Sequence, residues 1–509
     1  MSTTPAVLRP SATPGTLLSA VLPQAPAIPV TGVSLDSRSV RPGDLYVALP
    51  GQVTHGARFA GDAVAAGAAA VLTDPSGREY LEAIDVPVVV VADPRGEMAA
   101  VAVEVYGRPA ERAGLFGVTG TVGKTSTMCL VAAGLAAAGH TVGTIGTIGF
   151  TLAGRTLASP RTTVTTPESP DLQALLALMV EQGADAIAME VSSHALALHR
   201  VDGVTFDVAA FTNLGRDHLD FHVTQEAYFQ AKASLFRDGR CRAAVVNTDD
   251  EWGRRLEAEL RERGAVPLVT TGATGDYRPL GSEVVADGSS VVRLATPGGE
   301  REFALGMLGG FNVRNAATAV AMLDLAGVDL ERALPGFATA FVPGRMQRVD
   351  LGADAPGVVV DFAHTPEAVA AALTALPETR RIAVLGCGGD RDHAKRGPMG
   401  AAAATTASVV VVTDDNPRSE PPEEIRAQVL AGAREAAGES GAEVLDGGAR
   451  GEAIAMALRL AGPGDWVAVL GKGHESGQQL ADRTIAFDDV TEVRRAWSVL
   501  HPGREEQYA

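Results

Sequence analysis

Short apolar runs that end in polar loops recur along most of the chain. Four of them alternate with helical stretches between residues 113 and 342, namely LFGVTG, ADAIAMEVSS, VAAFTNL and AAVVNTDD. A second series follows, made of GVVVDFAH, RIAVLGCGG, SVVVVTDDNPR and WVAVLGKGHE. Uninterrupted apolar strands joined by helices are typical of parallel sheets that are buried on both faces. Ligands bind beyond the carboxyl ends of such strands, so we expect the functional residues in these loops.

The first 112 residues have a different pattern, in which apolar runs such as AAVLTD and VPVVVVAD are separated by turn sequences such as RPGD and LPGQ. We therefore predict three α/β domains. They are a small N-terminal α/β domain over residues 1–112, a central P-loop-type parallel-sheet domain over 113–342, and a C-terminal Rossmann-like domain over 343–509. The length of 509 residues agrees with about three domains.

Composition narrows the class of protein. With 46% hydrophobic and 20% charged residues, the chain is typical of a globular protein. Its net charge of −18 argues against a nucleic-acid-binding surface, which needs clustered positive charge. Three widely spaced cysteines argue against a disulfide framework and against a zinc site. We find no secretion signal and no apolar run long enough for a membrane span, so we expect a cytoplasmic protein with no membrane partner.

The stretch GVTGTVGKTST begins at Gly117 and lies between a predicted strand, LFGV, and a predicted helix, TSTMCLVAAGLAAAG. A glycine-rich turn in this position can aim backbone N–H groups and the helix N-terminus at phosphate oxygens. The match to the usual G-x-x-x-x-G-K-[ST] loop is imperfect, because Val118 stands where the first glycine belongs. The alternative without a binding function is a glycine-rich strand-to-helix turn that carries a surface lysine. The predicted nucleotide contacts in this loop are Gly120, Thr121, Gly123, Lys124, Thr125 and Ser126.

The loop TGTVGKTST is similar to that of the Mur ligases, the ATP-dependent amide-forming enzymes of peptidoglycan assembly. Nine further stretches follow in the family's order: TTPESPDLQ, EVSSHALALHRV, FTNLGRDHLDFH, FNVRNAATAVA, PGRMQRV, DFAHTPEA, CGGDRD, TDDNPR and GKGHE. The resemblance extends from LDSRSVRPGDLYVALPG near residue 35 to GKGHE near residue 475. Where the family loop usually carries Asn, this chain has Val122, which removes a side-chain amide and leaves the backbone cradle possible.

The resemblance implies a ligation driven by ATP. The γ-phosphoryl group is transferred to a carboxylate, and an amine then displaces phosphate from the resulting acyl phosphate. No protein nucleophile is needed, so the important residues are those that hold metals, neutralise charge and position substrates. The implied partners are small molecules: ATP as co-substrate, UDP-N-acetylmuramoyl dipeptide and meso-diaminopimelate, with Mg²⁺ as cofactor. We expect the chain to act on them as a monomer.

The catalytic and metal-binding residues implied by the family are Lys124, Thr125, Glu190, His218 and Lys232. Glu190 and His218 follow predicted strands. An acidic residue at a strand end is, however, more often a capping residue or a member of an ion pair, and His is an unusual ligand for Mg²⁺. Lys232 in AYFQAKASLF is, from the sequence alone, typical of a solvated helix lysine. The matching family lysine is carbamylated by CO₂, and that reaction requires an amine with a lowered pKa.

Further nucleotide contacts are implied at Asn312, Arg345 and Asp361. Each has a structural alternative, because Asn312 could cap a helix, Arg345 could lie in a surface turn and Asp361 could end a strand. An arginine in a linker between two domains is well suited to reach phosphates when the domains close.

For the UDP substrate, the family places the nucleotide in the first domain and the peptide near the second. The matching positions are Leu35, Ser37, Gln52, Val53, Thr54, Thr165, Thr166, Ser192 and Arg200. Hydroxyl groups and an arginine suit diphosphate and carboxylate oxygens, although each Ser or Thr alone is more often a turn or cap residue.

The predicted selectivity depends on DNPR, residues 415–418. Meso-diaminopimelate carries a distal carboxylate that lysine lacks, and the guanidinium of Arg418 can hold such a group through two hydrogen bonds. Glu475 suits the distal ammonium. The full set of amino-acid contacts implied by the family is Arg391, Asp415, Asn416, Pro417, Arg418, Gly471 and Glu475.

Other functions stay open at this point. A related ligase could add lysine or ornithine, or extend folate as a folylpolyglutamate synthetase. From another class, a P-loop switch could bind partners without forming an amide. Against the switch, the sequence has no N-K-x-D guanine-binding motif, and a switch has no use for a third domain that carries DNPR.

Overall fold

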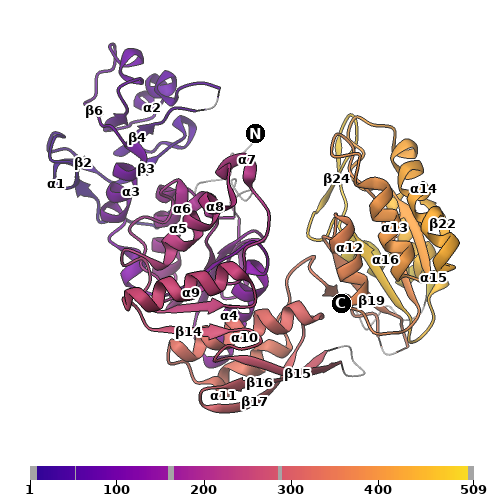
Figure 1. The fold of residues 1–509 in the computed structure, drawn as a ribbon. Coiled ribbons are helices and arrows are strands. Elements are labelled where there is room, and N and C mark those ends of the chain that lie inside the picture. The colour runs from indigo at the N-terminus through magenta and orange to yellow at the C-terminus, as the bar shows by residue number, and fades with distance from the viewer. Residues whose placement is uncertain (1–7, 52, 159–164, 285–288, 353, 503–509) are drawn as a thin grey trace. The chain divides into compact units, whose positions relative to one another are not determined.

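The fold was obtained as a computed structural model that describes residues 8–51, 53–158, 165–284, 289–352 and 354–502. The chain divides into two compact units. Unit 1 comprises residues 1–281, 293–303 and 314–339, and unit 2 comprises residues 282–292, 304–313 and 340–509. The main sheet of each unit has helices on both of its faces (Figure 1).

The largest sheet of unit 1 has the strand order β10-β9-β8-β11-β7-β12-β13-β14. The strands β8, β11, β7, β12, β13 and β14 are parallel, and β9 and β10 are antiparallel. Their bounds are β7 Gly114–Thr119, β8 Val142–Gly146, β9 Gly149–Leu152, β10 Arg155–Leu157, β11 Ala186–Glu190, β12 Val208–Phe211, β13 Ala244–Asn247 and β14 Leu268–Thr271. The chain builds first on one side of β7 and then on the other, which places a topological switch point, the usual site for ligands, beside β7.

Helices cover both faces of this sheet. On one face, alternate strand residues such as Leu115, Ile187 and Phe211 share a core with α5, α6, α8 and α9. On the other face, α4 packs against β7, β8 and β11. These helices span α4 Lys124–Ala138, α5 Ser169–Glu181, α6 Ser193–Ala197, α8 Gln225–Ala233 and α9 Glu251–Arg263. Burial on both faces explains why the strands are apolar at nearly every position.

A second, smaller sheet of unit 1 comes from the first hundred residues. It has four parallel strands in the order β3-β4-β5-β6, which span Gly32–Ser34, Asp44–Ala48, Ala70–Thr73 and Val88–Val90. Val33, Leu45 and Leu72 pack on α1 (Leu18–Val21) and α3 (Pro94–Val105), and Tyr46 and Val71 pack on the side of α2 (Ala60–Ala65).

The main sheet of unit 2 has the order β18-β19-β23-β20-β21-β22 and is parallel except for β18. Its strands span β18 Gln347–Arg348, β19 Gly357–Asp361, β20 Arg381–Leu385, β21 Val409–Thr413, β22 Glu443–Gly448 and β23 Trp466–Leu470. Odd and even strand positions face different cores, one shared with α12 (Pro366–Thr374), α13 (Arg396–Thr406) and α14 (Pro422–Ser440), the other with α15 (Arg450–Leu460) and α16 (Asp489–Leu500).

The remaining elements are short or lie outside these sheets. The additional strands are β1 Thr16–Leu17 with β2 Pro29–Val30, β15 Arg278–Val284 with β16 Ser290–Thr296 and β17 Gly299–Leu305, and β24 Gly477–Gln479 with β25 Thr484–Ala486. The additional α-helices are α7 Leu219–His222, α10 Gly310–Leu325 and α11 Leu330–Ala333. Single 3₁₀ turns occupy Ser37–Ser39, Gly56–Phe59, Arg78–Tyr80, Pro109–Glu111, Ser234–Phe236 and Leu334–Ala338.

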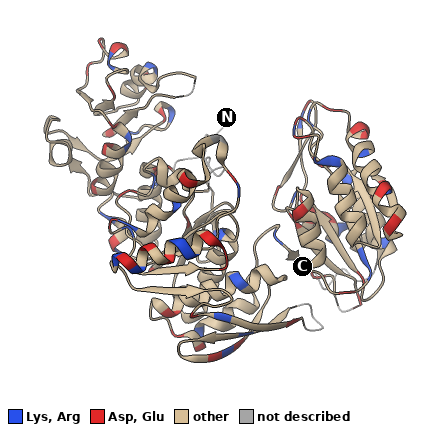
Figure 2. Ribbon diagram, in the orientation of Figure 1, with Lys and Arg blue, Asp and Glu red and all other residues tan. Residues whose placement is uncertain are grey.

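The predicted fold class is confirmed, because every apolar run named above forms a strand and the main sheets are parallel. The predicted domain boundaries at 112/113 and 342/343 stay a prediction. Acidic and basic residues alternate along surface helices such as α9 (Figure 2), where Arg255 pairs with Glu259 and Arg261 with Glu257. Within the described ranges, no helix is both long and apolar enough to cross a membrane.

Candidate active site

The predicted phosphate loop joins β7 to α4. Gly120 and Gly123 have φ angles of +147° and +87°, which only glycine adopts without strain. A Cβ atom on Gly120 would lie 1.9 Å from Thr212 Oγ1, and one on Gly123 would lie 2.5 Å from Asn315 Oδ1. The loop can therefore approach its neighbours closely only because both positions lack a side chain.

Gly120→Ala is expected to weaken nucleotide binding by about tenfold or more, because the added Cβ meets Thr212 and the positive φ is strained, at a cost of roughly 1–3 kcal/mol. Calorimetric titration with ADP measures the effect. Gly61→Ala is the matched control, since its Cβ would meet nothing within 4 Å. Equal ADP affinity in both variants and the wild type would contradict this role of the loop.

Residues that follow β12 hold the loop in place. The backbone N–H of Thr121 donates to Asn213 O at 2.9 Å, and the N–H of Val122 donates to Asn213 Oδ1 at 3.0 Å. Thr212 Oγ1 donates to Val122 O at 2.7 Å. The Val122 side chain is 66% exposed, so its substitution for the family's Asn leaves the backbone of the loop anchored from the neighbouring strand.

Two lysines converge on one carbonyl of the loop. Lys124 Nζ donates to Gly120 O at 3.0 Å and Lys232 Nζ donates to the same oxygen at 2.7 Å. Lys232 is 1% exposed and lies 4.6 Å above the ring of Tyr228. Burial and the nearby charge of Lys124 hold the pKa of Lys232 well below its usual range. The interpretation of Lys232 as a solvated helix lysine is therefore wrong.

Glu190 ends β11, the strand beside β7, and its side chain is fully buried. Its Oε1 accepts hydrogen bonds from Thr125 Oγ1 at 3.0 Å and from the N–H of Thr147 at 2.8 Å, and Oε2 accepts from Thr147 Oγ1 at 3.2 Å. The carboxylate and the Thr125 hydroxyl at the start of α4 thus lie together. Ser126 follows them in the first turn of α4.

These oxygens fit a hard cation such as Mg²⁺. Magnesium usually takes one or two carboxylates together with substrate phosphates, rather than a complete protein cage. In the part of the chain that the structure describes, no group of three or more His, Cys, Asp or Glu side chains could hold a metal by itself. Glu190 and Thr125 are therefore suited to a metal that arrives with a nucleotide.

His218 precedes α8 and its ring lies near that of Tyr228, which is on the same buried face of α8 as Lys232. The ring centroids of His218 and Tyr228 are 6.0 Å apart, and those of His218 and His194 are 4.9 Å apart. Its φ of +52° is left-handed, and its side chain is 46% exposed, with Nε2 3.5 Å from Asp217. The structure thus brings His218 to the lysine cluster through Tyr228, which also lies 3.1 Å from the Thr121 hydroxyl.

The predicted peptide contacts of unit 1 gather at the end of β11. Thr166 Oγ1 donates to Glu190 O at 2.9 Å and accepts from the N–H of Ser192, while Thr165 Oγ1 lies 3.0 Å from Thr147 Oγ1. Ser192 also caps α6 by accepting from Ala195 N. The guanidinium of Arg200 is paired with Glu168 at 2.8 Å, so its charge is partly compensated by this carboxylate.

The predicted uridine contacts lie at one edge of the small sheet. Leu35 and Ser37 follow β3, and Val53 and Thr54 follow its parallel neighbour β4. Val53 and Thr54 are exposed, whereas Ser37 is buried in a 3₁₀ turn. Gln52 lies outside the described residues.

Unit 2 holds the other predicted nucleotide contacts. Asp361 ends β19, where its Oδ2 accepts from Met346 N at 2.6 Å, and burial raises its pKa although Met346 N–H and Arg345 oppose the shift. Arg345 is exposed and its guanidinium lies 4.8 Å above the Phe362 ring. Asn312 is buried in the first turn of α10, and its Nδ2 donates to Leu308 O at 2.8 Å.

The predicted amino-acid contacts of unit 2 come together beyond the ends of β20, β21 and β23. Asn416 Nδ2 donates to Glu475 Oε2 at 2.8 Å. Arg418 has a left-handed φ of +51° after Pro417, and its Nη1 donates to Gly389 O at 2.8 Å.

Two glycines allow the cluster to pack closely. Gly388 lies beside two arginines, since a Cβ there would lie 2.9 Å from Arg418 Nη1 and 3.7 Å from Arg391 Cγ. Gly471 has a φ of +114°, and a Cβ there would lie 2.8 Å from Asp415 Oδ2. These residues therefore form a cluster that carries both signs of charge.

Lys472 belongs to this cluster and was missed from the sequence. It is fully buried, and its Nζ donates to Gly477 O at 2.6 Å, to Glu475 Oε2 at 3.1 Å and to Asn416 Oδ1 at 3.3 Å. These three bonds use all the donors of an ammonium group, so Lys472 orients Glu475 and Asn416. Lysine is rare in this chain: the four are Lys124, Lys232, Lys395 and Lys472. That rarity was the available signal.

A buried ion pair supports the end of β23 beside the cluster. Arg450 and Asp489 are both fully buried, with 2.7 Å between Nη2 and Oδ2 and a second bond of 2.7 Å from Nε to Oδ1. Arg450 Nη2 also donates to Leu470 O at 3.1 Å. The pair therefore connects α15 and α16 to the strand that leads into Gly471.

Asp489→Asn is expected to lower the free energy of unfolding of unit 2 by about 3–5 kcal/mol, because it leaves the charge of Arg450 buried without a counter-ion. Hydrogen exchange of α15 and α16 amides under native conditions measures the change. Glu492→Gln, which breaks a pair with the exposed Arg495 on the same helix, is the control and should cost less than about 1 kcal/mol. A similar small effect of both variants would contradict the prediction.

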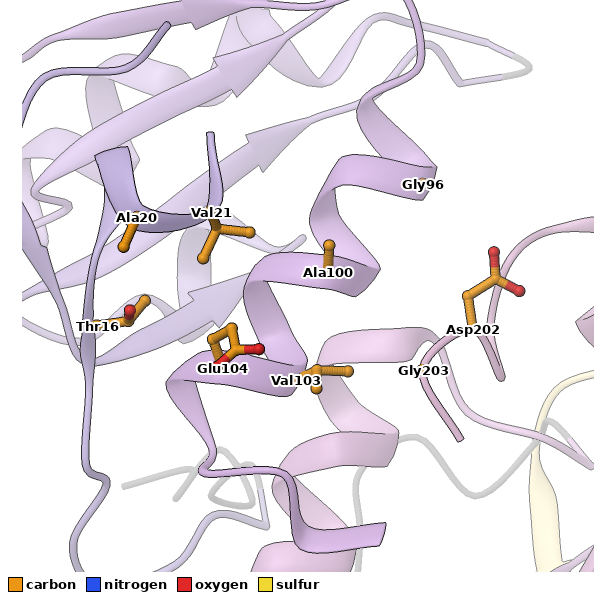
Figure 3. Close-up of a pocket in the computed structure, with 9 residues that line it drawn as sticks. All are labelled: Thr16, Ala20, Val21, Gly96, Ala100, Val103, Glu104, Asp202 and Gly203. Carbon is orange, nitrogen blue, oxygen red and sulfur yellow. The ribbon is translucent and has the colours of Figure 1, made fainter. Parts of the chain in front are cut away.

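A separate pocket of unit 1, of about 560 Å³, lies between α1, α3 and the segment at Asp202 (Figure 3). Its carboxylates are already paired, Glu104 with Arg108 and Asp202 with Arg240. Val103 contributes to an apolar wall. Because the described lining residues include none of the predicted site residues, we assign this pocket no part in the reaction.

Comparison with known families agrees with this geometry. The model of the Mur ligase family catalytic domain matches residues 29–106, that of the Mur ligase middle domain matches residues 118–323, and that of the Mur ligase glutamate ligase domain matches residues 344–473. The chain belongs to the Mur ligase family. The resemblance predicted from the sequence motifs is confirmed.

Several relatives that are similar to this chain over most of its length share one enzyme name. The chain is 48% identical to the UDP-N-acetylmuramoyl-L-alanyl-D-glutamate–2,6-diaminopimelate ligase of Streptomyces coelicolor over 476 residues, which cover 92% of each chain. It is 47% identical to the ligase of the same name from Corynebacterium glutamicum, again with 92% of each chain covered. A solved structure of a ligase with this name is 32% identical, with a TM-score of 0.72, and covers 96% of this chain and 99% of its own.

Proposed function

We propose that this Mur ligase adds meso-diaminopimelate to UDP-N-acetylmuramoyl-L-alanyl-D-glutamate at the expense of ATP, in the synthesis of peptidoglycan precursors. Membership of the Mur ligase family supports this function. So do the relatives named diaminopimelate ligases, whose similarity covers 92% of this chain and of theirs. The reaction activates a carboxylate of the dipeptide as an acyl phosphate, which the amine of meso-diaminopimelate then attacks to form an amide and release phosphate.

The observation that carries the choice of amino acid is the presence of Arg418 and Glu475 in one cluster, where each bonds other residues of the cluster. Asn416 bonds Glu475 and lies two residues before Arg418, so a cation and an anion face the same loop. Meso-diaminopimelate offers a carboxylate and an ammonium at its distal end, which complement this arrangement. Arg391, Asp415, Pro417 and Gly471 complete the proposed amino-acid site.

At the nucleotide site, the loop from Gly120 to Gly123 cradles the phosphates, and Thr125 and Ser126 begin the helix whose N-terminus faces them. Lys124, which bonds Gly120 O and Thr121 O, exchanges these carbonyls for the terminal phosphates when the nucleotide binds. Asn312, Arg345 and Asp361 are proposed nucleotide contacts contributed by unit 2.

Thr125, Glu190, His218 and Lys232 are the residues that would hold Mg²⁺ together with the phosphates. Bound Mg²⁺ supplies neutralisation of the charge that develops on the transferred phosphoryl group. Lys232 becomes an oxygen ligand by adding CO₂ to its neutral amine, with release of one proton. The burial of Lys232 and its lowered pKa support this modification, because only the uncharged amine reacts with CO₂.

The UDP substrate is proposed to bind unit 1. Its nucleotide contacts Leu35, Ser37 and the segment from Gln52 to Thr54, and its peptide contacts Thr165, Thr166, Ser192 and Arg200. The link from Thr166 to the strand end at Glu190 supports the placement of the peptide beside the phosphoryl-transfer site. We also propose that the enzyme works in the cytoplasm as a monomer, without nucleic-acid or membrane partners.

Lysine and ornithine are poorer candidates, because neither has the distal carboxylate that Arg418 would bind. Glutamate, the amino acid that a folylpolyglutamate synthetase adds, has a side-chain carboxylate but no distal ammonium for Glu475 to bind. ADP release is the test: purified enzyme with ATP, Mg²⁺ and the UDP dipeptide is supplied with meso-diaminopimelate, lysine, ornithine or glutamate in turn. We expect release only with meso-diaminopimelate. Equal or faster release with lysine would contradict the proposed substrate.

A further inference from the structure

The short hairpin of β24 (Gly477–Gln479) and β25 (Thr484–Ala486) lies against the DNPR segment of unit 2. Strand β24 contacts this segment at successive residues. Gln478 Nε2 donates to Asp415 O at 2.6 Å, and the backbone N–H of Gln479 donates to Asn416 Oδ1 at 2.9 Å. The N–H of Arg418 in turn donates to Gln479 O at 3.1 Å. The hairpin therefore fixes the backbone on which Arg418 stands.

The side chain of Gln479 also contacts the guanidinium of Arg418. Arg418 Nε donates to Gln479 Oε1 at 2.8 Å, while Nη1 donates to Gly389 O at 2.8 Å. An arginine side chain has only donors, so the atom of Gln479 that faces it is the amide oxygen. Arg418 is thus held from two directions, by the hairpin and by the loop after β20.

These two bonds determine which edge of the guanidinium remains available. Of its five N–H groups, the one on Nε and one on Nη1 are used. Within the described residues, the other N–H of Nη1 and both of Nη2 have no acceptor. Because one N–H from each of two adjacent nitrogens is what a bidentate carboxylate requires, the Nη1–Nη2 edge of Arg418 is the edge left for such a group.

We propose that Gln479 is a positioning residue for substrate selection, which turns the Nη1–Nη2 edge of Arg418 toward the distal carboxylate of the amino-acid substrate. The proposal rests on the proposed function, in which that carboxylate distinguishes meso-diaminopimelate from lysine. Gln479 acts through Arg418 and contacts no reacting atom. Without the Gln479 acceptor, the Nε–H seeks another partner and the guanidinium rotates among several orientations, which weakens a two-bond contact more than a single charge contact.

The test compares discrimination, measured as the ratio of kcat/KM for meso-diaminopimelate to that for lysine. Gln479→Leu removes the acceptor at similar volume, and this ratio is expected to fall about tenfold or more, as for loss of a hydrogen bond to a charged group. The fall comes from the KM for meso-diaminopimelate, and the KM values for ATP and the UDP dipeptide stay unchanged. Gln479→Glu, which keeps an acceptor, is expected to retain the wild-type ratio.

Two further variants separate positioning from a structural effect. Thr484→Val changes the residue directly opposite Gln479 in the hairpin and should leave discrimination unchanged. In an Arg418→Ala background, Gln479→Leu should change the ratio by less than about twofold, because the residue through which it acts is gone. Thermal unfolding of each variant checks that the fold is retained.

The outcomes distinguish this proposal from the proposed function. A wild-type enzyme that uses lysine as well as meso-diaminopimelate would overturn the proposed function. A selective wild type whose ratio is unchanged by Gln479→Leu would overturn only the role of Gln479. Three other outcomes would also overturn the role of Gln479. They are an equal loss with both amino acids, a further tenfold loss in the Arg418→Ala background, and lost discrimination in a folded Gln479→Glu variant.

Discussion

Replacing Lys232 with methionine is expected to reduce kcat by about 10³-fold or more, with the fold retained. Methionine fills nearly the same buried volume beside Tyr228, but it has no amine to bond Gly120 O or to take up CO₂. Loss of one preorganised group that stabilises developing charge costs about 10²–10³ in rate, and the variant also loses the anionic metal ligand that we propose at this position. Steady-state release of ADP with all three substrates measures the effect.

A second readout separates carbamylation from a purely structural lysine. Enzyme equilibrated with ¹³C-labelled bicarbonate should show a carbamate carbon signal by NMR, and this signal should vanish in Lys232→Met. Arg255→Met, which removes an exposed cation of α9 that pairs with Glu226 of α8, is the control and should keep wild-type turnover. Full activity of Lys232→Met, or an active wild type without a carbamate signal, would contradict the assigned role of Lys232.

Arg418→Ala is expected to lower kcat/KM for meso-diaminopimelate by about 10²- to 10³-fold, because the distal carboxylate loses the bidentate partner that we propose for it. The value for lysine should stay the same or rise, and nucleotide binding should not change. Phosphate release at varied amino-acid concentration, together with ADP titration, measures both. Arg418→Lys keeps the positive charge but not the planar guanidinium that donates two parallel hydrogen bonds, so it should give an intermediate loss of kcat/KM.

Arg483→Ala is the matched control for this variant. Arg483 lies between β24 and β25 but is largely exposed and pairs with Asp482, so its removal should leave both amino acids unaffected. Wild-type use of meso-diaminopimelate by Arg418→Ala would remove the basis for the proposed amino-acid selectivity.

Much of the fold could be predicted because parallel strands that are buried on both faces are continuous apolar runs. The strands β19 and β23, for example, are GVVVD and WVAVL. The strands without such runs were missed. Strand β8 is VGTIG and contains two glycines, and β22 is EVLDGG at the edge of its sheet, where one side of the strand stays polar and exposed.

The candidate site was predictable where the chemistry is local and was not where it depends on distant contacts. Strand ends identify Glu190 in the main sheet of unit 1 and Asp361 in that of unit 2, since polar residues after apolar runs gather at the carboxyl edge of their own sheet. The burial of Lys232 follows from the packing of α8, where Tyr228 and Lys232 are four residues apart on one buried face. The rarity of lysine points to Lys472, but the contacts of Lys472 and Gln479 could not be predicted from sequence, because their partners in residues 415–418 lie about sixty positions away.

The central claim is that the carboxylate becomes reactive by taking the γ-phosphoryl group of ATP. An isotope experiment tests this most directly: the dipeptide substrate is labelled with ¹⁸O in its reacting carboxylate, and the phosphate released during ligation with meso-diaminopimelate is analysed by mass spectrometry. Phosphate that carries one ¹⁸O atom for each amide formed is the predicted result. Unlabelled phosphate, released while the amide forms at the normal rate, would contradict the claim.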